Sequence, residues 1–443
     1  HLIQGGIKMR TFHGGIHPSD HKFGTADKPI IDLAPPEELV FPLSQHIGAP
    51  SIPCVSVGDT VLVGQKIADA NGFVSANLHS SVSGTVTAIT DVLHISGRNM
   101  QSVVIENDGL EEVSDSVCPP TVENREQFLQ AVRNSGSIGL GGAGFPTSLK
   151  LGFDPKEKQP DFLIINGAEC EPYITSDYRC FMEEGEDVLE GVVLMLKYLG
   201  IPKCVIGIEK NKPKAIEKMT KLCEKHDNIT VKPLKSSYPQ GAEKTLIFST
   251  TGRVVKEGTL PLASGCIVVN SSTAAFIAQY IRTGMPLVKR RITVDGNIVK
   301  KPSNFIVPVG MSIGEIVYYA ELSDKPDRII LGGPMMGACA FDPDYPLSKT
   351  NNAVLMFADS PVYEPSECIR CGKCVKACSM NLLPTELEHA FDMRDARRLE
   401  KLKVNLCVNC GACSFVCPAK RNLAEKNQLA KAFLREQSTR KGK

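Results

Sequence analysis

Short runs in which apolar and polar residues alternate occupy residues 55–89. Glycine-containing turns separate these runs at Gly58, Gly64, Gly72 and Gly84. Alternation with a period of two residues is typical of strands that bury one face. We therefore expect an all-β module, which we place over residues 9–115.

The pattern changes near residue 120, where helical and strand-like segments begin to alternate. Helices are predicted at residues 125–134, 186–199 and 214–226, and strands at residues 162–165 and 205–208. Strands separated by helices of this length are typical of crossover connections and a largely parallel sheet. The pattern predicts an α/β domain over residues 116–288.

Past Arg290 the chain returns to short apolar strands. Segments 292–294 and 306–309 lie on either side of a turn at Gly296, and a helix is predicted at residues 313–320. Strand, turn, strand and helix in this order suit a small β-grasp-like module, which we place at residues 289–358.

The remaining residues divide into a predicted helical domain at 359–430 and a basic tail at 431–443. Leu387, Phe391, Leu399 and Leu402 follow an approximately helical spacing. The tail is expected to be a solvated, frayed terminus, and docking to a membrane or another subunit is the alternative. Residues 1–8 precede Met9 and look like the remnant of an expression tag, so they are left out of the fold. The chain as a whole is expected to be a multidomain α/β protein.

Composition excludes some function classes. The 443 residues suffice for roughly three domains. Lys and Arg number 50 against 49 Asp and Glu, a net charge of +1, so the overall charge gives no reason to expect a nucleic acid partner. No apolar stretch approaches the ~20 residues needed to cross a bilayer. We therefore expect a soluble chain that is at most peripheral to a membrane.

Eight of the 16 cysteines fall into two runs near the end of the chain. Each run has the spacing Cys-x2-Cys-x2-Cys-x3-Cys, which binds [4Fe–4S] clusters, and the fourth Cys of each run ligates the other cluster. On this rule one cluster takes Cys368, Cys371, Cys374 and Cys417, and the other takes Cys407, Cys410, Cys413 and Cys378. Pro418 follows one run whereas Ser379 follows the other, so we expect the clusters to differ in environment and potential.

Zinc sites and disulfides account for these cysteines less well. Structural zinc also accepts Cys-x2-Cys pairs, but eight thiolates in two runs of four fit cubanes better. A disulfide framework is typical of small secreted domains rather than of a long chain. Free cysteines and cluster ligands both need a reducing compartment, which points to a cytoplasmic electron carrier.

A glycine-rich loop at residues 139–146 matches the GxGxxG pattern of nucleotide-binding sites. Its context differs from a Rossmann fingerprint, because the loop follows a predicted helix and precedes the first convincing strand of its domain. Consecutive glycines still let backbone N–H groups approach a phosphate or a flat ring, and Lys150 lies nearby. A phosphate-bearing cofactor is the favoured interpretation, and a turn needed only for chain reversal is the alternative.

Polar residues follow the strand predicted at residues 162–165. Asn166, Glu169 and Glu171 would lie at the carboxyl edge of a parallel sheet, where open α/β sheets bind ligands. Carboxylates accept hydrogen bonds from ribose hydroxyls or a carboxamide, and an amide can both donate to and accept from a flavin ring edge. The alternative is a solvated loop with ordinary surface acids. Cys170 and Cys180 receive no role, because a lone cysteine is usually a packing residue.

Residues 57–61 and 82–86 resemble the hammerhead fold of biotinyl and lipoyl carrier domains. Residues 71–81, which lie between them, contain no lysine, so attachment of biotin or lipoate is not expected. A structural barrel-sandwich module is the favoured interpretation.

The glycine loop together with residues 166–171 looks like the FMN- and NADH-binding fingerprint of the flavin subunit of respiratory complex I. Segments 241–245 and 268–272 resemble further flavin-contacting segments of that family. With the motifs at residues 13–18 and 332–337 and the two cysteine runs, residues 10–430 resemble the RnfC family, which supplies one subunit of the Rnf complex. In that resemblance the β-grasp-like module is SLBB-like.

The resemblance implies roles that spacing alone does not give. Four glycines would wrap the cofactors, one aromatic ring would stack near the nicotinamide, and one lysine would meet the FMN phosphate: Gly139, Gly141, Gly142, Gly144, Phe145 and Lys150. Asn166, Glu243 and Asn270 would touch the flavin, and Glu169 and Glu171 would lie nearer NADH. No catalytic residue is assigned.

A hydride carries two electrons whereas a cubane accepts one, and a flavin converts between the two. We therefore expect a subunit that passes electrons between NAD(H), FMN and two [4Fe–4S] clusters, within a membrane-bound ferredoxin:NAD⁺ oxidoreductase that pumps Na⁺ or H⁺. It would be peripheral, on the cytoplasmic side of the cell membrane. Its partners would be other subunits of the complex, including a ferredoxin-like iron–sulfur subunit.

Two alternatives differ in class. A soluble NADH-dependent reductase, such as a cobalamin reductase, uses the same modules, but in that family the flavin module comes first, whereas here a β module precedes it. A non-catalytic, cluster-bearing adaptor would have lost nucleotide binding, and the intact glycine loop argues against this.

Overall fold

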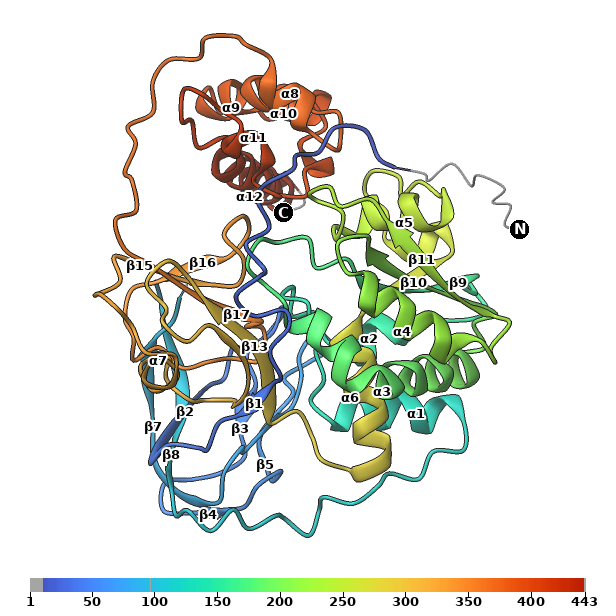
Figure 1. The fold of residues 1–443 in the computed structure, drawn as a ribbon, viewed down its shortest axis with the longest axis vertical. Helices are drawn as coiled ribbons and strands as arrows, with labels where there is room; N and C mark the ends of the chain where they lie inside the picture. Colours follow the sequence, from blue (N-terminus) through green and yellow to red (C-terminus); the bar gives the residue numbers. More distant parts are fainter. Residues whose placement is uncertain (1–10, 96, 442–443) are drawn as a thin grey trace.

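The computed structural model describes residues 11–95 and 97–441, without the side chains of Arg440 and Lys441. The expected tag remnant at residues 1–8 lies outside the described residues. A β module, an α/β domain and a second sheet form the body of the molecule, and a helical part lies at one end (Figure 1). No helix within the described ranges combines the length and the hydropathy needed to cross a membrane.

The β module consists of two small antiparallel sheets. One contains β2 (Glu38–Pro42), β8 (Asn99–Asn107), β7 (Gly84–Leu93) and β4 (Thr60–Val61), and the other contains β3 (Ile52–Pro53), β5 (Lys66–Asp69) and β6 (Leu78–His79). Alternate residues such as Leu39 and Phe41 on β2 and Val103 and Ile105 on β8 are fully buried in one core. The predicted all-β module is therefore confirmed, since the period of two places one face of each strand inside.

A four-stranded parallel sheet forms the centre of the α/β domain, in the order β11-β10-β9-β12. Its strands are β9 (Phe162–Gly167), β10 (Lys203–Glu209), β11 (Ile229–Leu234) and β12 (Cys266–Asn270), and its helices are α1 (Arg125–Asn134), α2 (Thr147–Leu151), α3 (Ser176–Leu199), α4 (Pro213–Cys223), α5 (Glu243–Thr251) and α6 (Ser271–Thr283). Leu163 and Ile165 pack against α3 and α6, whereas Ile164 packs against α5 on the other face. Helices thus cover both faces, which explains the continuous apolar run in β9.

The second sheet has the order β1-β14-β13-β17-β15-β16. Its elements are β1 (Ile31–Asp32), β13 (Lys289–Asp295), β14 (Ser303–Pro308), β15 (Arg328–Leu331), β16 (Ala338–Ala340) and β17 (Ala353–Phe357), with α7 (Ile313–Ala320) packed on it. β1 pairs in parallel with β14, with Ile31 opposite Phe305. Residues 31–32, expected in the β module, therefore belong to this sheet, because a strand of two residues has no periodicity that could assign it.

The helical part contains α8 (Lys373–Ala377), α9 (Pro384–Asp392), α10 (Ala396–Lys401), α11 (Ala412–Phe415) and α12 (Leu423–Lys441). Leu387, Phe391 and Leu399 are buried in one core with Ala430 and Leu434 of α12, as their helical spacing predicts. The basic tail does not fray at residue 431, because α12 continues to Lys441 and packs its apolar residues on this core.

Candidate functional site

The helical part gathers the eight cysteines into two groups of four. Cys368, Cys371, Cys374 and Cys417, here called the first thiol set, line a cavity of ≈ 490 Å³. Cys378, Cys407, Cys410 and Cys413, the second thiol set, line a separate and smaller cavity. Each thiol set combines three cysteines of one run with the last cysteine of the other run. This is the grouping that the spacing predicts.

The two sets differ in exposure to solvent. Cys368 and Cys371 of the first set are exposed, and Cys374 and Cys417 are buried. The second set has one buried member, Cys413, and its other members are half-buried. The first set therefore faces outward more than the second.

The chemistry of these side chains fits iron–sulfur clusters. Burial raises the pKa of Cys410 to about 11 and that of Cys413 to about 12, since a low-dielectric surrounding disfavours the thiolate. Iron ions offset this cost because they supply the positive charge that a buried thiolate lacks. Four thiols around one cavity, twice over, are a donor set for two cubanes.

The glycine loop lies between α1 and α2, before the first strand of its domain, so it is not a Rossmann fingerprint, as its sequence context predicts. Gly139 N–H donates to the carbonyl of Phe145 at 2.8 Å, and Gly144 N–H donates back to Gly139 at 3.3 Å. Gly141 and Gly142 at the tip are exposed, and among the described residues nothing accepts a hydrogen bond from their N–H groups. Two backbone donors at the tip therefore have no acceptor within the described part of the chain.

Hydrogen bonds from three parts of the chain fix the glycine loop in place. Leu140 N–H donates to Thr273 Oγ1 at 3.0 Å, and its carbonyl accepts from Arg290 Nη2 at 2.9 Å. Ile47 of the β module donates its N–H to the carbonyl of Gly144 at 3.0 Å. The loop is therefore braced before any ligand binds.

Asn270 lies beside the tip of the loop. A Cβ added at Gly141 would lie 3.2 Å from Asn270 Nδ2, so a larger residue there would crowd Asn270. Asn270 Oδ1 caps α6 by accepting from Ser272 N–H at 2.9 Å, and Nδ2 donates to Asp177 Oδ2 at 2.7 Å. The predicted flavin contact is thus also a helix cap.

The other predicted flavin residues lie at the carboxyl edge of the same sheet. Asn166 is the second-last residue of β9, and its Nδ2 donates to the carbonyl of Gly241 at 2.9 Å. Lys150 Nζ and Glu243 Oε1 form an ion pair at 2.6 Å, which joins α2 to the start of α5. Phe145 is half-buried in the glycine loop. The structure therefore gathers these residues around one edge.

Glu169 and Glu171 accept hydrogen bonds from other residues of the chain. Glu169 Oε1 accepts from the N–H of Asp177 at 2.6 Å at the start of α3. Glu171 Oε2 accepts from Met335 N–H at 3.0 Å, and Oε1 lies 3.2 Å from the Tyr238 hydroxyl. Burial raises the pKa of both carboxyls, that of Glu171 to about 7.

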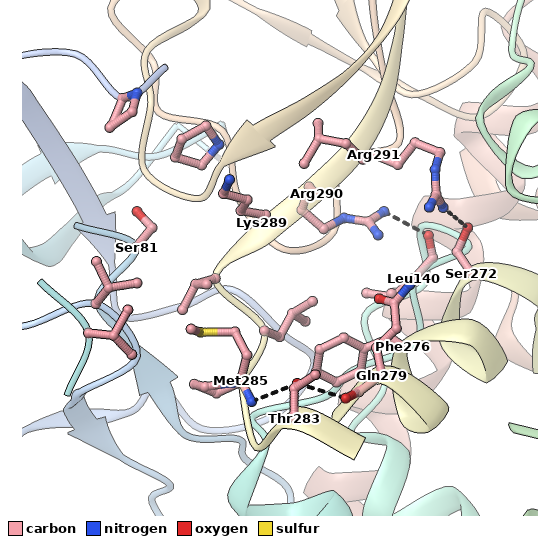
Figure 2. A pocket seen from close by; sticks show the side chains of 18 of the residues that line it. Ser81, Leu140, Ser272, Phe276, Gln279, Thr283, Met285, Lys289, Arg290 and Arg291 are labelled. Atoms are coloured by element: carbon pink, nitrogen blue, oxygen red, sulfur yellow. Dashed lines mark hydrogen bonds between the residues drawn. The ribbon is translucent and has the colours of Figure 1, made fainter. Parts of the chain in front are cut away.

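Another cavity lies beside this edge rather than at it. It measures ≈ 540 Å³ and separates α6 from the β module and from β13. Leu140 and Ser272 line it, whereas none of the eleven predicted cofactor residues does. Figure 2 shows Arg290 reaching from β13 to the Leu140 carbonyl, with Arg291 beside it on Ser272.

The residues at the sheet edge fit a phosphate-bearing flavin. Gly142 has a φ of +101°, and nothing lies within 4 Å of a Cβ added there, so the tip leaves open space for a ligand. Free backbone donors can hold an anion, and a nearby ammonium adds charge. An amide at the end of β9 can pair with a ring edge.

Sequence reasoning missed three residues that organise this region. Arg290 is 2% exposed and braces the glycine loop. Lys22 is buried and donates to the carbonyls of Glu169 at 3.0 Å and Glu171 at 2.9 Å. Tyr238, 2% exposed, reaches the carbonyl of Cys410 at 2.6 Å. None of the three lies in a recognisable motif, and only the adjacent Arg290-Arg291 pair in an apolar strand was a visible signal.

Three family models match the chain in the order of its structural parts. The RnfC Barrel sandwich hybrid domain matches residues 10–110, the Nuo51 FMN-binding domain matches residues 132–279, and the 4Fe-4S dicluster domain matches residues 367–421. An FMN domain followed by a dicluster domain defines an electron-transfer protein with FMN and [4Fe–4S] clusters as cofactors.

Three relatives match over most of their own length. The C subunit of the Na(+)-translocating ferredoxin:NAD(+) oxidoreductase complex of Acetobacterium woodii is 42% identical, over 86% of this chain and 87% of its own. The C subunit of the proton-translocating complex of Clostridium ljungdahlii is 41% identical, over 90% and 88%. The C subunit of the ion-translocating oxidoreductase complex of Rhodobacter capsulatus is 37% identical, over 98% and 85%. The chain belongs to the RnfC family.

Proposed function

We propose that this chain is the subunit that passes electrons between NAD(H) and two [4Fe–4S] clusters in an ion-translocating ferredoxin:NAD⁺ oxidoreductase complex. FMN, when bound, supplies the conversion between a two-electron hydride and single electrons. The relatives are named as subunits of such complexes, which supports an oxidoreductase that works beside other subunits.

One observation carries the proposal. The segment 238–241 touches both predicted cofactor regions, because Gly241 accepts a hydrogen bond from Asn166 and Tyr238 donates to Cys410. Three peptide units therefore connect the edge of the parallel sheet to the second thiol set. A protein that transfers electrons between a flavin and a cluster needs such proximity.

The chain's own residues would bind and orient the cofactors. The N–H groups of Gly141 and Gly142 would receive FMN at the loop tip, and Lys150 would exchange part of its pairing with Glu243 for the FMN phosphate. Asn166 and Asn270 would orient the ring. Gly139, Gly144 and Phe145 keep their roles from the resemblance.

The two acids expected near NADH would support the nucleotide site from behind its backbone. Glu169 and Glu171 would shape the nucleotide site through the backbone that they hold, since their carboxylates accept hydrogen bonds from N–H groups of the chain. These hydrogen bonds favour a supporting role over direct contact.

The finer fold assignments belong to the same proposal. The β module would be a hammerhead-type barrel sandwich, and the six-stranded sheet with α7 would be an SLBB-like β-grasp domain. Pairing of β1 with β14 and packing of α7 on the sheet support the second assignment.

The first thiol set would exchange electrons with the partner, a ferredoxin-like iron–sulfur subunit. Its exposed members, Cys368 and Cys371, lie on the outward side of the helical part. We place the subunit on the cytoplasmic side of the membrane as a peripheral component.

The test is anaerobic purification followed by counts of iron and extractable flavin. The expected result is about eight irons, four for each cubane, and one flavin per chain. Addition of NADH should bleach the flavin and then the clusters. Iron without any spectral response to NADH would instead indicate a cluster-bearing adaptor.

A further inference from the structure

Residues 13–18, here called the N-terminal strap, run alongside the helical part (Figure 1). Gly15 N–H donates to the carbonyl of Ala377 at 3.0 Å, next to the ligand Cys378. Ile16 exchanges two backbone hydrogen bonds of 2.9 Å with Tyr238. The strap therefore joins one side of the second thiol set to the α/β domain.

Gly14 makes the approach of the strap possible. Its φ is +72°, and a Cβ there would lie 2.7 Å from the carbonyl oxygen of Cys378. Any other L-residue would have to move the strap or the ligand.

Tyr238 reaches the other side of the second thiol set. Its hydroxyl donates to the carbonyl of Cys410 at 2.6 Å, and its ring is buried with Ile16, Ala377 and Ala412. This core also contacts the half-buried Cys170, whose Sγ accepts from Gly241 N–H at 3.3 Å.

A third contact comes from the second sheet. Residues 332–337, here called the glycine–methionine turn, follow β15. Met335 N–H donates to Glu171, and a Cβ at Gly411 would lie only 2.7 Å from the carbonyl oxygen of Met335. Gly411 lies between the ligands Cys410 and Cys413, so the glycine–methionine turn packs directly against the loop that carries these two ligands.

We propose that the N-terminal strap, Tyr238 and the glycine–methionine turn form a clasp that holds the second cluster at a set distance from the flavin site, with Tyr238 as the residue that positions Cys410. The inference rests on the proposed function and assigns a role to two motifs and a tyrosine that cofactor binding does not use. Hydrogen bonds and solvent exposure tune cluster potentials, so the clasp also sets the potential of this cluster. No equivalent contact from these three elements reaches the first thiol set in the described part of the chain.

The test replaces the hydroxyl alone. Tyr238→Phe is compared with Tyr363→Phe, whose exposed ring lies 4.2 Å from Lys420 Nζ on the side of the first set. Both proteins are purified without oxygen with clusters in place. Redox titration with mediators, followed by electron paramagnetic resonance, then reports each centre separately.

Tyr238→Phe should lower the midpoint potential of one of the two centres and leave the other unchanged, because a hydrogen bond donated near a cluster favours its reduced, more negative form. Reduction of the clusters after NADH is added should slow by about threefold to tenfold, the loss expected for one hydrogen bond. Flavin bleaching and iron content should stay as in the unchanged chain. Titration curves that match those of Tyr363→Phe would overturn the inference.

A second pair of variants tests the strap. Gly14→Ala meets the Cys378 carbonyl, whereas Gly58→Ala has a similar positive φ of +93° and open space around it. Only Gly14→Ala should change the midpoint potential and the electron paramagnetic resonance signal of the second centre. An equal effect of both variants would contradict the clasp. The titrations need neither NADH nor flavin, so a failure of NADH to reduce the protein would reject the proposed function and still leave the clasp tested.

Discussion

Side chains that sequence patterns treat as cofactor ligands also hold the fold together. Glu169 accepts from the N–H of Asp177, which lies only eight residues downstream at the start of α3. Glu171 accepts from the N–H of Met335, which lies 164 residues away. The first contact is local and the second depends on the tertiary fold. A motif fixes the residue type, but the direction of a side chain depends on partners that the motif does not contain.

The cysteines are the opposite case, because spacing alone predicts their grouping. Cys378→Ser should therefore remove the same spectroscopic centre as Cys407→Ser, although these residues come from different runs. Each variant should retain about four irons of about eight, since one cubane is lost. Iron analysis with electron paramagnetic resonance checks this.

The matched control is Cys417→Ser. It should remove the centre of the first thiol set, as Cys368→Ser does. If Cys378→Ser and Cys368→Ser abolished the same centre, each cluster would be built from a single run, against the grouping in the structure.

At the level of elements, local pattern predicted the α/β domain well and the connections between domains poorly. The predicted helix at residues 125–134 matches α1, and the strand at 162–165 lies within β9. The helix expected at residues 186–199 corresponds to the part of α3 that follows a kink at Glu184, where φ is −122° and ψ is 28°. The part before the kink, from Ser176, was not predicted, and its first turn is held by Glu169, which lies outside the helix and accepts from the Asp177 N–H.

Two helix caps separate stability from cofactor binding. Asn270→Ala at α6 and Asn124→Ala at α1 each remove a side chain that accepts from backbone N–H groups. Each should lower the free energy of unfolding by about 1 kcal/mol. Only Asn270→Ala should also weaken FMN binding, since only Asn270 lies beside the glycine loop.

Thermal unfolding and FMN fluorescence titration measure the two effects. Equal FMN affinity in both variants would show that Asn270 serves only as a cap.

At the scale of the whole molecule, one buried lysine joins three parts. Lys349, which precedes β17, donates to the carbonyls of Asn77 in the β module at 2.7 Å and Gly136 in the α/β domain at 3.0 Å. It is 1% exposed, and burial lowers its pKa to about 7. Sequence pattern could not reveal this junction, because its members lie in three separate segments.

The lowered pKa gives a pH dependence of stability. Between pH 7 and the ordinary lysine pKa near 10.4, the unfolded chain binds more protons than the folded one, so stability rises with pH. This contribution is at most about 1.4 kcal/mol per pH unit in that window. Lys349→Met should remove it, and the exposed Lys66→Met should not.

Thermal unfolding of the three proteins at pH 7, 8 and 9 checks the prediction. Parallel pH profiles for the unchanged chain and Lys349→Met would contradict it.

The N-terminal strap also constrains how the protein is made. The ribosome makes the strap before its partners Ala377 and Cys378, which follow roughly 360 residues later, on the order of 20 s or more at about 5–20 residues per second. The strap can pair with Tyr238 once the α/β domain has been made, but its contacts with Ala377 and Cys378 must wait for the helical part. Closure of the clasp accordingly follows synthesis of the helical part. Insertion of the second cluster can precede closure or follow it but cannot occur while the chain is still growing toward Cys413.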